Sequence, residues 1–345
     1  MKITRLFLAL TAVVLASCTS DDDSQTALGS YDNGVLVLNE GGTGELTYIS
    51  DDLSIVQNDI FNTVNGDTRD LGSYAQSLFF NGDRAYIISN GSNKITVVNR
   101  YSFEYIATIS SGMQVPRYGV VHNGKAYVTN MNDFMSDTDD FVTVINLADF
   151  SVETPIPINT RAERIIAAGG KLYVSGGAFG MGDKLTVVDP GTKSIDTVLQ
   201  VGVSPNSLEE KNGKIYLLCG SFDGDSKLVK IDMANNAIED EIDFPASMSN
   251  AQNLDIEGNS IYFSAASKVY KIDLNAEHVV DTPLFDTESQ SPYIGYGFAV
   301  NGNRIYISEA ASDFASSGKA FVYSTSGEPI TQITVGLGPN GFYFN

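Results

Sequence analysis

The sequence of 345 residues predicts an all-β fold, a seven-bladed β-propeller of four-stranded antiparallel blades. Two observations lead to this prediction. A short motif with a central tyrosine recurs six times, and successive tyrosines lie 41 to 46 residues apart. In addition, an early segment reads as a blade without its first strand, and the last segment reads as a first strand without its blade. Together these two ends predict a closed ring.

The repeated motif begins with Asn-Gly or a Gly-containing substitute and continues as a strand. Its six copies are NGDRAYIIS (81–89), NGKAYVTN (123–130), GGKLYVSG (169–176), NGKIYLLC (212–219), EGNSIYFS (257–264) and NGNRIYIS (301–308). Asn-Gly favours a hairpin because a type I′ turn needs positive φ at both central residues. The alternating side chains that follow indicate a half-buried strand. Each copy therefore predicts a turn from a first strand (A) into a second strand (B).

A second motif in five of the units predicts the rest of each blade. It reads KITVVN, FVTVIN, KLTVVD, KLVKID or KVYKID and ends at Asn99, Asn146, Asp189, Asp232 and Asp273. The Asn or Asp side chain can bond the backbone two residues on and turn the chain. Each unit therefore has a third strand (C), a turn and a fourth strand (D). A helical solenoid is excluded, because no segment shows a sustained 3.6-residue period.

The two ends of the propeller complement each other. Residues 32–61 supply an Asn-Gly turn and strands B, C and D, but no strand A. The last residues, GPNGFYFN (338–345), supply a strand A with no continuation. We therefore expect the C-terminal strand to pair into the N-terminal blade, which removes an exposed apolar edge. The pattern departs at Val37, where the other six blades have tyrosine.

The N-terminus has the features of a secretory signal. Residues 1–17 have a basic start, a short apolar middle and small residues at the end. Leu15 to Cys18 resembles a bacterial lipobox, so we expect lipidation of Cys18; the alternative is an ordinary signal peptide. Residues 18–31 read as an acidic flexible stalk that resembles the export signal of surface lipoproteins, or else as a solvated spacer. The expected location is the outer membrane, lipid-anchored, with the propeller (32–345) facing the cell exterior.

Composition excludes several classes of function. The formal net charge is −21, and loss of Lys2 and Arg5 with the signal makes it −23. A surface this acidic repels phosphate backbones, so we expect no nucleic-acid partner. Apart from Cys18 the chain has only Cys219, which rules out a disulfide within the propeller and reads as a small core residue. Two histidines in the whole chain argue against an enzyme.

Placing the blades in register predicts a binding site. The D–A and B–C loops of a propeller share one face, at the mouth of the central channel. The positions at the start of each strand A bring amides, arginines and tyrosines to that mouth, a mixture suited to a polar small molecule. The predicted ligand-binding residues are Gln76, Arg117, Tyr118, Arg164, Asn206, Gln252, Tyr296 and Asn340. The alternative is that these side chains only satisfy loop carbonyls around the channel.

Four B–C loops each carry one phenylalanine in an otherwise small and polar segment. These residues, Phe134, Phe179, Phe222 and Phe314, are expected to form an apolar rim around the mouth. Exposed apolar groups on one face often mark an interaction site. In the alternative interpretation, each phenylalanine is a local anchor beneath its own loop.

No cofactor is expected from the motifs. The loop with Asp133, Asp137, Asp139 and Asp140 offers oxygen ligands for calcium, but it lacks the glycine and distal glutamate of an EF-hand loop. A solvated acidic loop is the preferred interpretation, and a metal site is not predicted.

The opening VLVLNEGGTGELTYI, the TVVN and TVID strand ends and the closing PNGFYFN resemble the YncE-like seven-bladed propellers, in their form as outer-membrane surface lipoproteins. The resemblance implies capture of a small molecule, with cobalamin or another corrinoid as the first candidate, and delivery to a TonB-dependent transporter. A fold alone does not define a ligand. The alternatives are a protein-binding scaffold and, less favoured, a lyase or a quinoprotein-like oxidoreductase.

Overall fold

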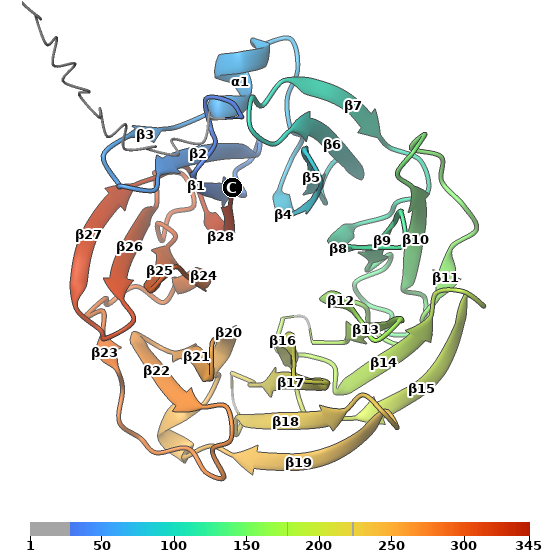
Figure 1. The fold of residues 1–345 in the computed structure, drawn as a ribbon, viewed down its shortest axis with the longest axis vertical. Coiled ribbons are helices and arrows are strands. Elements are labelled where there is room, and N and C mark those ends of the chain that lie inside the picture. The colour runs from blue at the N-terminus through green and yellow to red at the C-terminus, as the bar shows by residue number, and fades with distance from the viewer. Residues whose placement is uncertain (1–27, 178, 223) are drawn as a thin grey trace, which may run out of the picture.

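The computed structural model describes residues 28–177, 179–222 and 224–345, so the expected signal peptide and Cys18 lie outside the described residues. Seven four-stranded sheets surround a central axis, with the first strand of each blade innermost (Figure 1). All neighbouring strands within a sheet are antiparallel. The predicted seven-bladed propeller is confirmed.

The strands follow the predicted order A, B, C, D in every blade. Blade 1 contains β28 (Pro339–Phe344), β1 (Gly34–Asn39), β2 (Glu45–Ser50) and β3 (Val56–Gln57). Blade 2 contains β4 (Ala75–Asn81), β5 (Arg84–Ser89), β6 (Lys94–Asn99) and β7 (Tyr105–Ile109). Blade 3 contains β8 (Pro116–His122), β9 (Lys125–Asn130), β10 (Phe141–Asn146) and β11 (Ile156–Pro157).

The remaining blades follow the same order. Blade 4 contains β12 (Ile165–Ala168), β13 (Lys171–Ser175), β14 (Lys184–Asp189) and β15 (Ser194–Gln200). Blade 5 contains β16 (Pro205–Lys211), β17 (Lys214–Cys219), β18 (Lys227–Asp232) and β19 (Ala237–Asp243). Blade 6 contains β20 (Gln252–Glu257), β21 (Ser260–Ala265), β22 (Lys268–Asp273) and β23 (Phe285–Asp286). Blade 7 contains β24 (Ile294–Asn301), β25 (Arg304–Glu309), β26 (Lys319–Ser324) and β27 (Pro329–Thr334).

The C-terminal strand closes the ring as predicted. In the register of β28 with β1, Phe342 lies opposite Val37 and Phe344 lies opposite Val35. Arg100 of blade 2 binds the chain end, because its Nε donates to Asn345 Oδ1 at 2.9 Å and its Nη2 donates to the Phe344 carbonyl at 2.8 Å. The last residues therefore belong to blade 1 and also contact blade 2.

The core lies between adjacent blades. The repeated tyrosines Tyr86, Tyr127, Tyr173, Tyr216, Tyr262 and Tyr306 are all buried, at 0 to 3% exposure. In blade 1, Phe342 packs against Tyr306 of blade 7 with ring centroids 5.6 Å apart, beside the smaller Val37. Each blade thus buries an apolar face against its neighbours, and burial of this kind is the main stabilising contribution to such a fold.

Two features of blade 1 differ from the sequence prediction. Its strand D, β3, is only two residues long, and it is followed by a short helix, α1 (Ile60–Asn65), that the repeat pattern does not predict. Ile60 and Phe61 of this helix are buried against blades 1 and 2. Tyr31, which the sequence assigned to the stalk, packs against Tyr48 and Phe103. The folded unit therefore includes the end of the predicted stalk. A 3₁₀ turn, η1 (Ala246–Met248), lies between blades 5 and 6.

Candidate functional site

Most predicted binding residues occupy bulges at the start of the innermost strands. The register shifts between Ala75 and Ser77 in β4, between Pro116 and Gly119 in β8 and between Pro205 and Ser207 in β16. A bulge redirects side chains that would otherwise alternate between the two faces of the sheet. The shifts therefore explain how the residues between these pairs turn toward the channel mouth.

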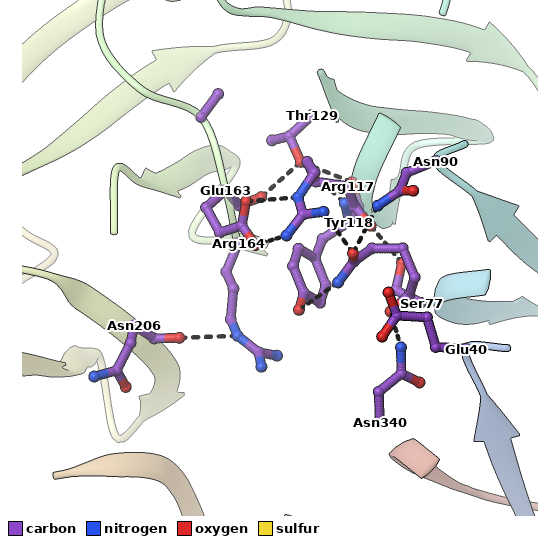
Figure 2. Close-up of polar contacts among 12 residues, drawn as sticks. Glu40, Ser77, Asn90, Arg117, Tyr118, Thr129, Glu163, Arg164, Asn206 and Asn340 are labelled. Carbon is purple, nitrogen blue, oxygen red and sulfur yellow. Dashed lines mark hydrogen bonds and ion pairs between the residues drawn. The ribbon is translucent and has the colours of Figure 1, made fainter. Parts of the chain in front are cut away.

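Arg117 and Gln76 form the centre of a hydrogen-bonded cluster at that mouth (Figure 2). Arg117 donates from Nε and Nη2 to the Glu163 carboxylate, at 2.8 and 2.7 Å, and from Nη1 to Gln76 Oε1 at 2.5 Å. Gln76 Oε1 also accepts a hydrogen bond from Asn90, at 3.0 Å, and Gln76 Nε2 donates to the Tyr118 hydroxyl at 3.1 Å. The cluster joins blades 2, 3 and 4.

The Arg117–Glu163 pair is buried, with 7% and 6% of each residue exposed. Burial alone would lower the pKa of Arg117, but the adjacent Glu163 carboxylate raises it above its ordinary value. A bidentate pair of this kind is geometrically specific, and its loss leaves a charge without a partner. Arg117 lies at the mouth as predicted, and each of its three side-chain nitrogens donates to a protein group. The structure therefore gives Arg117 a structural role in joining blades 3 and 4.

Arg164 is held differently. Its Nε donates to the Asn206 carbonyl at 2.9 Å, and its guanidinium carbon lies 4.5 Å from the centre of the Tyr118 ring. Figure 2 shows its two terminal nitrogens extending into the opening, with no contact drawn to them. Arg164 thus has an anchored position and two nitrogens that face the mouth.

Tyr296 lies at the mouth in contact with a carboxylate that the sequence analysis missed. The Tyr296 hydroxyl donates to Glu40 Oε2. Burial raises the pKa of Tyr296, and the Glu40 charge raises it further. Glu40 follows β1, outside the strand A positions that were compared between blades, so the repeat gave no signal for it.

The alternative interpretation, in which polar side chains at the mouth satisfy carbonyls around the channel, is correct in part. At each of the seven blade junctions one side chain donates to a carbonyl near the start of the next strand A. The seven bonds are Asn340 Nδ2 to Ala75, Ser77 Oγ to Arg117, Thr129 Oγ1 to Glu163, Arg164 Nε to Asn206, Asn206 Nδ2 to Ala251, Asn253 Nδ2 to Gly295 and Ser308 Oγ to Pro339.

This ring assigns a structural role to two of the predicted ligand contacts. Asn206 and Asn340 each use their side-chain nitrogen to join neighbouring blades. Gln252 is half-buried and makes no side-chain hydrogen bond within the described parts of the chain, whereas its neighbour Asn253 supplies the junction contact. The sequence comparison selected Gln252 and missed Asn253, which lies one position further along the chain.

The four rim phenylalanines are exposed, at 45% for Phe134, 59% for Phe179, 67% for Phe222 and 41% for Phe314. Phe134 and Phe179 meet edge to face, with centroids 5.4 Å apart. Phe222 of blade 5 packs over Gly180, in the neighbouring loop of blade 4. These three form one apolar arc over blades 3, 4 and 5. Phe314 lies apart from the arc, against Tyr293 and Tyr296.

Hollows open between the loops of this arc. One, of about 310 Å³, is lined by residues that include Arg161, Lys184 and Val203. Another, of about 500 Å³, is lined by residues that include Val203, Cys219 and Lys227. Val203 is 53% exposed and adds apolar surface between the two hollows. The mouth face therefore has recesses beside the phenylalanine arc.

No group of three or more His, Cys, Asp or Glu side chains suited to a metal ion occurs in residues 28–177, 179–222 and 224–345. In the acidic loop, Asp139 Oδ2 accepts from Asn132 and Asp140 Oδ2 accepts from the Ala162 N–H. Burial raises the pKa of Asp140 to about 7. Asp140 therefore joins the loop to blade 4.

Deeper in the channel, Glu209 and Asp255 accept hydrogen bonds from the backbone N–H groups of Ile256 and Val300 in the next blade. Burial raises the pKa of both carboxyls.

Cys219 is buried as predicted, and burial raises the pKa of its thiol to about 12. A thiol in this state is a poor nucleophile at neutral pH.

Within the described residues, no helix has the length and apolar character needed to cross a membrane.

The family described as a domain of unknown function, DUF5074, matches residues 33–345. The chain belongs to the DUF5074 family. The match spans the whole propeller, and its description adds no activity. A comparison with curated proteins finds no match.

Solved structures similar to this member of the DUF5074 family share its fold. Hydrazine synthase of Kuenenia stuttgartiensis superimposes with a TM-score of 0.61 at 16% identity, over 75% of this chain and 86% of that chain. The computationally designed Ika8 protein gives a TM-score of 0.60 at 11% identity, over 92% of each chain. The dihydro-heme d1 dehydrogenase NirN gives 0.56 at 13% identity, over 91% of this chain and 76% of that chain. Identities this low support the fold alone.

Proposed function

We propose that this protein is an outer-membrane lipoprotein of the cell surface that captures a small molecule at its channel mouth and delivers it to a TonB-dependent transporter. The observation that carries the proposal is the combination of surfaces at that mouth. Exposed phenyl rings lie beside the polar cluster of the mouth, since the Arg117 guanidinium is 5.4 Å from the centre of the Phe179 ring, and that end of the channel also holds Arg164 and Tyr118. Apolar contact area with a few oriented donors is what a small-molecule site requires.

A corrinoid is the first ligand to test, because the chain resembles propellers that capture cobalamin. Titration of the purified chain with cobalamin, followed by calorimetry and by the corrinoid absorption spectrum, tests this step. Saturable heat with a spectral shift supports it. No heat and no shift at cobalamin concentrations up to about 1 mM would rule out a corrinoid ligand.

The location and the partner need separate experiments. Mass spectrometry of the N-terminal peptide should find a lipid on Cys18, and protease added to intact cells should digest a surface-exposed propeller. Co-purification from outer membranes should bring a TonB-dependent transporter with the protein. An unmodified Cys18 would contradict the lipid anchor, and full protection in intact cells would contradict surface exposure.

A second function, a protein-binding scaffold, is favoured by one observation. The arc of Phe134, Phe179 and Phe222 continues into Met135, which is 83% exposed. Apolar surface concentrated on one face is typical of contacts between proteins. A scaffold would retain its partner in a pull-down with no small molecule present, whereas capture and delivery would make the complex depend on the ligand.

A further inference from the structure

The hydrogen-bond donors at the mouth can be assigned one by one, beginning with Gln76. Arginine can only donate, so the Gln76 atom that faces Arg117 must be the carbonyl oxygen. That orientation directs Gln76 Nε2 toward Tyr118, whose hydroxyl oxygen therefore accepts. The Tyr118 proton is then left to donate to another group. No acceptor for it occurs among the described residues.

Tyr343 of the closing strand also has a hydroxyl proton that finds no acceptor among the described residues. Its hydroxyl oxygen accepts the backbone N–H of Leu78 at 3.0 Å, which leaves its own proton without an acceptor in the described structure. The side chain is half-buried, and its ring folds back over Gly341, where an added Cβ would lie 2.8 Å from the ring. Gly341 therefore leaves the space that Tyr343 occupies in the channel.

Arg164 contributes a third set of unused donors. Its Nε is bonded to the Asn206 carbonyl, but Nη1 and Nη2 have no hydrogen-bond partner in residues 28–177, 179–222 and 224–345. No ion pair is found for it there either, in contrast to Arg117, whose charge is matched by Glu163. Arg164 is therefore an unpaired cation at the mouth of a strongly acidic protein.

The three groups act on the same small region. The Arg164 guanidinium lies over the Tyr118 ring. The Tyr343 hydroxyl binds the N–H of Leu78 on β4, two residues after Gln76, whose side-chain amide binds the Tyr118 hydroxyl. Consistent with this placement, burial raises the pKa of Tyr343, Tyr118 raises it further and the Arg164 charge lowers it. Two carboxyls of the channel bear on this region: Glu209, whose raised pKa is lowered in part by the Arg164 charge, and Glu40, one of whose oxygens already accepts from Tyr296. Asn340 Oδ1 accepts no hydrogen bond within the described residues, but it is closed off from solvent.

We propose that Arg164, Tyr118 and Tyr343 together bind an oxyanion, a phosphate or carboxylate group carried by the ligand. This inference rests on the proposed capture of a small molecule at the same mouth and specifies the chemistry of one part of that molecule. A planar guanidinium with two free nitrogens suits an oxyanion with two accepting oxygens, and the two tyrosine hydroxyls would add further donors. All three donors are held in place before the anion arrives, so little ordering is required on binding.

The test uses the full chain and two probes, inorganic phosphate and acetate, each titrated against chloride at constant ionic strength. Binding is followed by calorimetry and by the shift in melting temperature. The two probes distinguish a phosphate site from a carboxylate site. We expect saturable binding of at least one probe, with a dissociation constant below about 10 mM. Arg164→Gln should weaken that binding about tenfold or more, since it removes a charged bidentate contact.

Further variants keep the test decisive if Arg164→Gln folds poorly. Tyr118→Phe and Tyr343→Phe should each weaken binding several-fold, and Glu40→Gln should strengthen it by removing a repulsive charge. Arg69→Gln is the matched control, because Arg69 is exposed beside Tyr105 at the outer edge of blade 2. The oxyanion site would be overturned if Arg164→Gln, Tyr118→Phe and Tyr343→Phe all bound the probe as tightly as the wild type. It would also be overturned if Arg69→Gln lost as much affinity as Arg164→Gln.

The outcomes also separate this inference from the proposed function. Cobalamin binding that survives while neither phosphate nor acetate binds would reject the oxyanion site and leave capture intact. Binding of either anion that depends on Arg164, without any corrinoid binding, would reject the corrinoid and support the oxyanion site. No saturable binding of any of these probes would count against both.

Discussion

The guanidinium of Arg117 and the carboxylate of Glu163 form a buried bidentate ion pair across the junction of blades 3 and 4, with donor–acceptor distances of 2.8 and 2.7 Å. The two residues are 46 positions apart in the chain. Glu163 also receives a contact at its backbone carbonyl from Thr129, so the same junction is held twice. The Arg117 charge at the mouth is therefore paired and joins two blades, whereas the neighbouring Arg164 has no ion-pair partner among the described residues.

Arg117→Ala should therefore destabilise the protein strongly. The substitution leaves the Glu163 carboxylate buried without a partner, which costs about 3 to 5 kcal/mol in comparable pairs. Chemical denaturation would measure the loss of unfolding free energy. Arg69→Ala, which removes an exposed arginine, should change it by less than about 0.5 kcal/mol. An Arg117→Ala variant as stable as Arg69→Ala would show that the pair contributes nothing to the fold.

Closure of the ring should depend on the last strand. Phe342 is 6% exposed and packs between blades 1 and 7, so Phe342→Ala should cost about 3 to 5 kcal/mol through lost burial and a residual cavity. The measurement is again the free energy of unfolding. Phe314→Ala is the control, because that ring is 41% exposed, and it should have a small effect. Similar losses in both variants would contradict a closing role for Phe342.

Stability should fall as pH rises from about 5 to 8. The pKa of Asp140 is raised to about 7 in the folded protein, chiefly by burial, above its ordinary value of 3.8. The folded state therefore binds the proton more tightly than the unfolded state, and the stabilisation from a neutral Asp140 is lost as pH rises through about 7. Burial raises the pKa of Glu209 and Asp255 as well, with the same sign.

Melting temperatures at several pH values would measure this dependence. Asp140→Asn cannot ionise, so it should retain more of its low-pH stability at pH 8 and give a flatter profile than the wild type. Asp149→Asn is a suitable control, since the pKa of that exposed carboxyl is lowered by Ser151. A profile of Asp140→Asn as steep as that of the wild type would assign the pH dependence to other groups.

The phenylalanine arc should matter for capture and not for folding. Replacing Phe134, Phe179 and Phe222 together with serine removes exposed apolar surface, so the melting temperature should change little. Binding of the ligand or retention of the partner should weaken by tenfold or more, because such rings provide much of the contact area in binding sites. Ile330→Ser on the outer strand β27, 47% exposed, serves as the control. Unchanged binding in the triple variant would exclude the arc from the site.

The sequence predicts where most residues of the candidate site lie, but it does not predict their hydrogen-bond partners. The repeat brings Gln76, Arg117, Tyr118 and Arg164 to one end of the innermost strands, and the structure places them there. The repeat could not show that Arg117 forms an ion pair with Glu163. Nor could it show that the two terminal nitrogens of Arg164 have no hydrogen-bond partner among the described residues. Glu40 and Tyr343 were missed, because each lies in blade 1, where the chain is divided between its two ends.

The sequence by itself determined the number of blades, their strand order and the closing pair of ends. Those features follow from local signals, since Asn-Gly turns and alternating side chains act over a few residues and repeat at a regular spacing. The tertiary structure alone decided which polar groups are paired and which remain free. Those partners come from different blades 40 or more residues apart, and bulges of one residue decide where each side chain points.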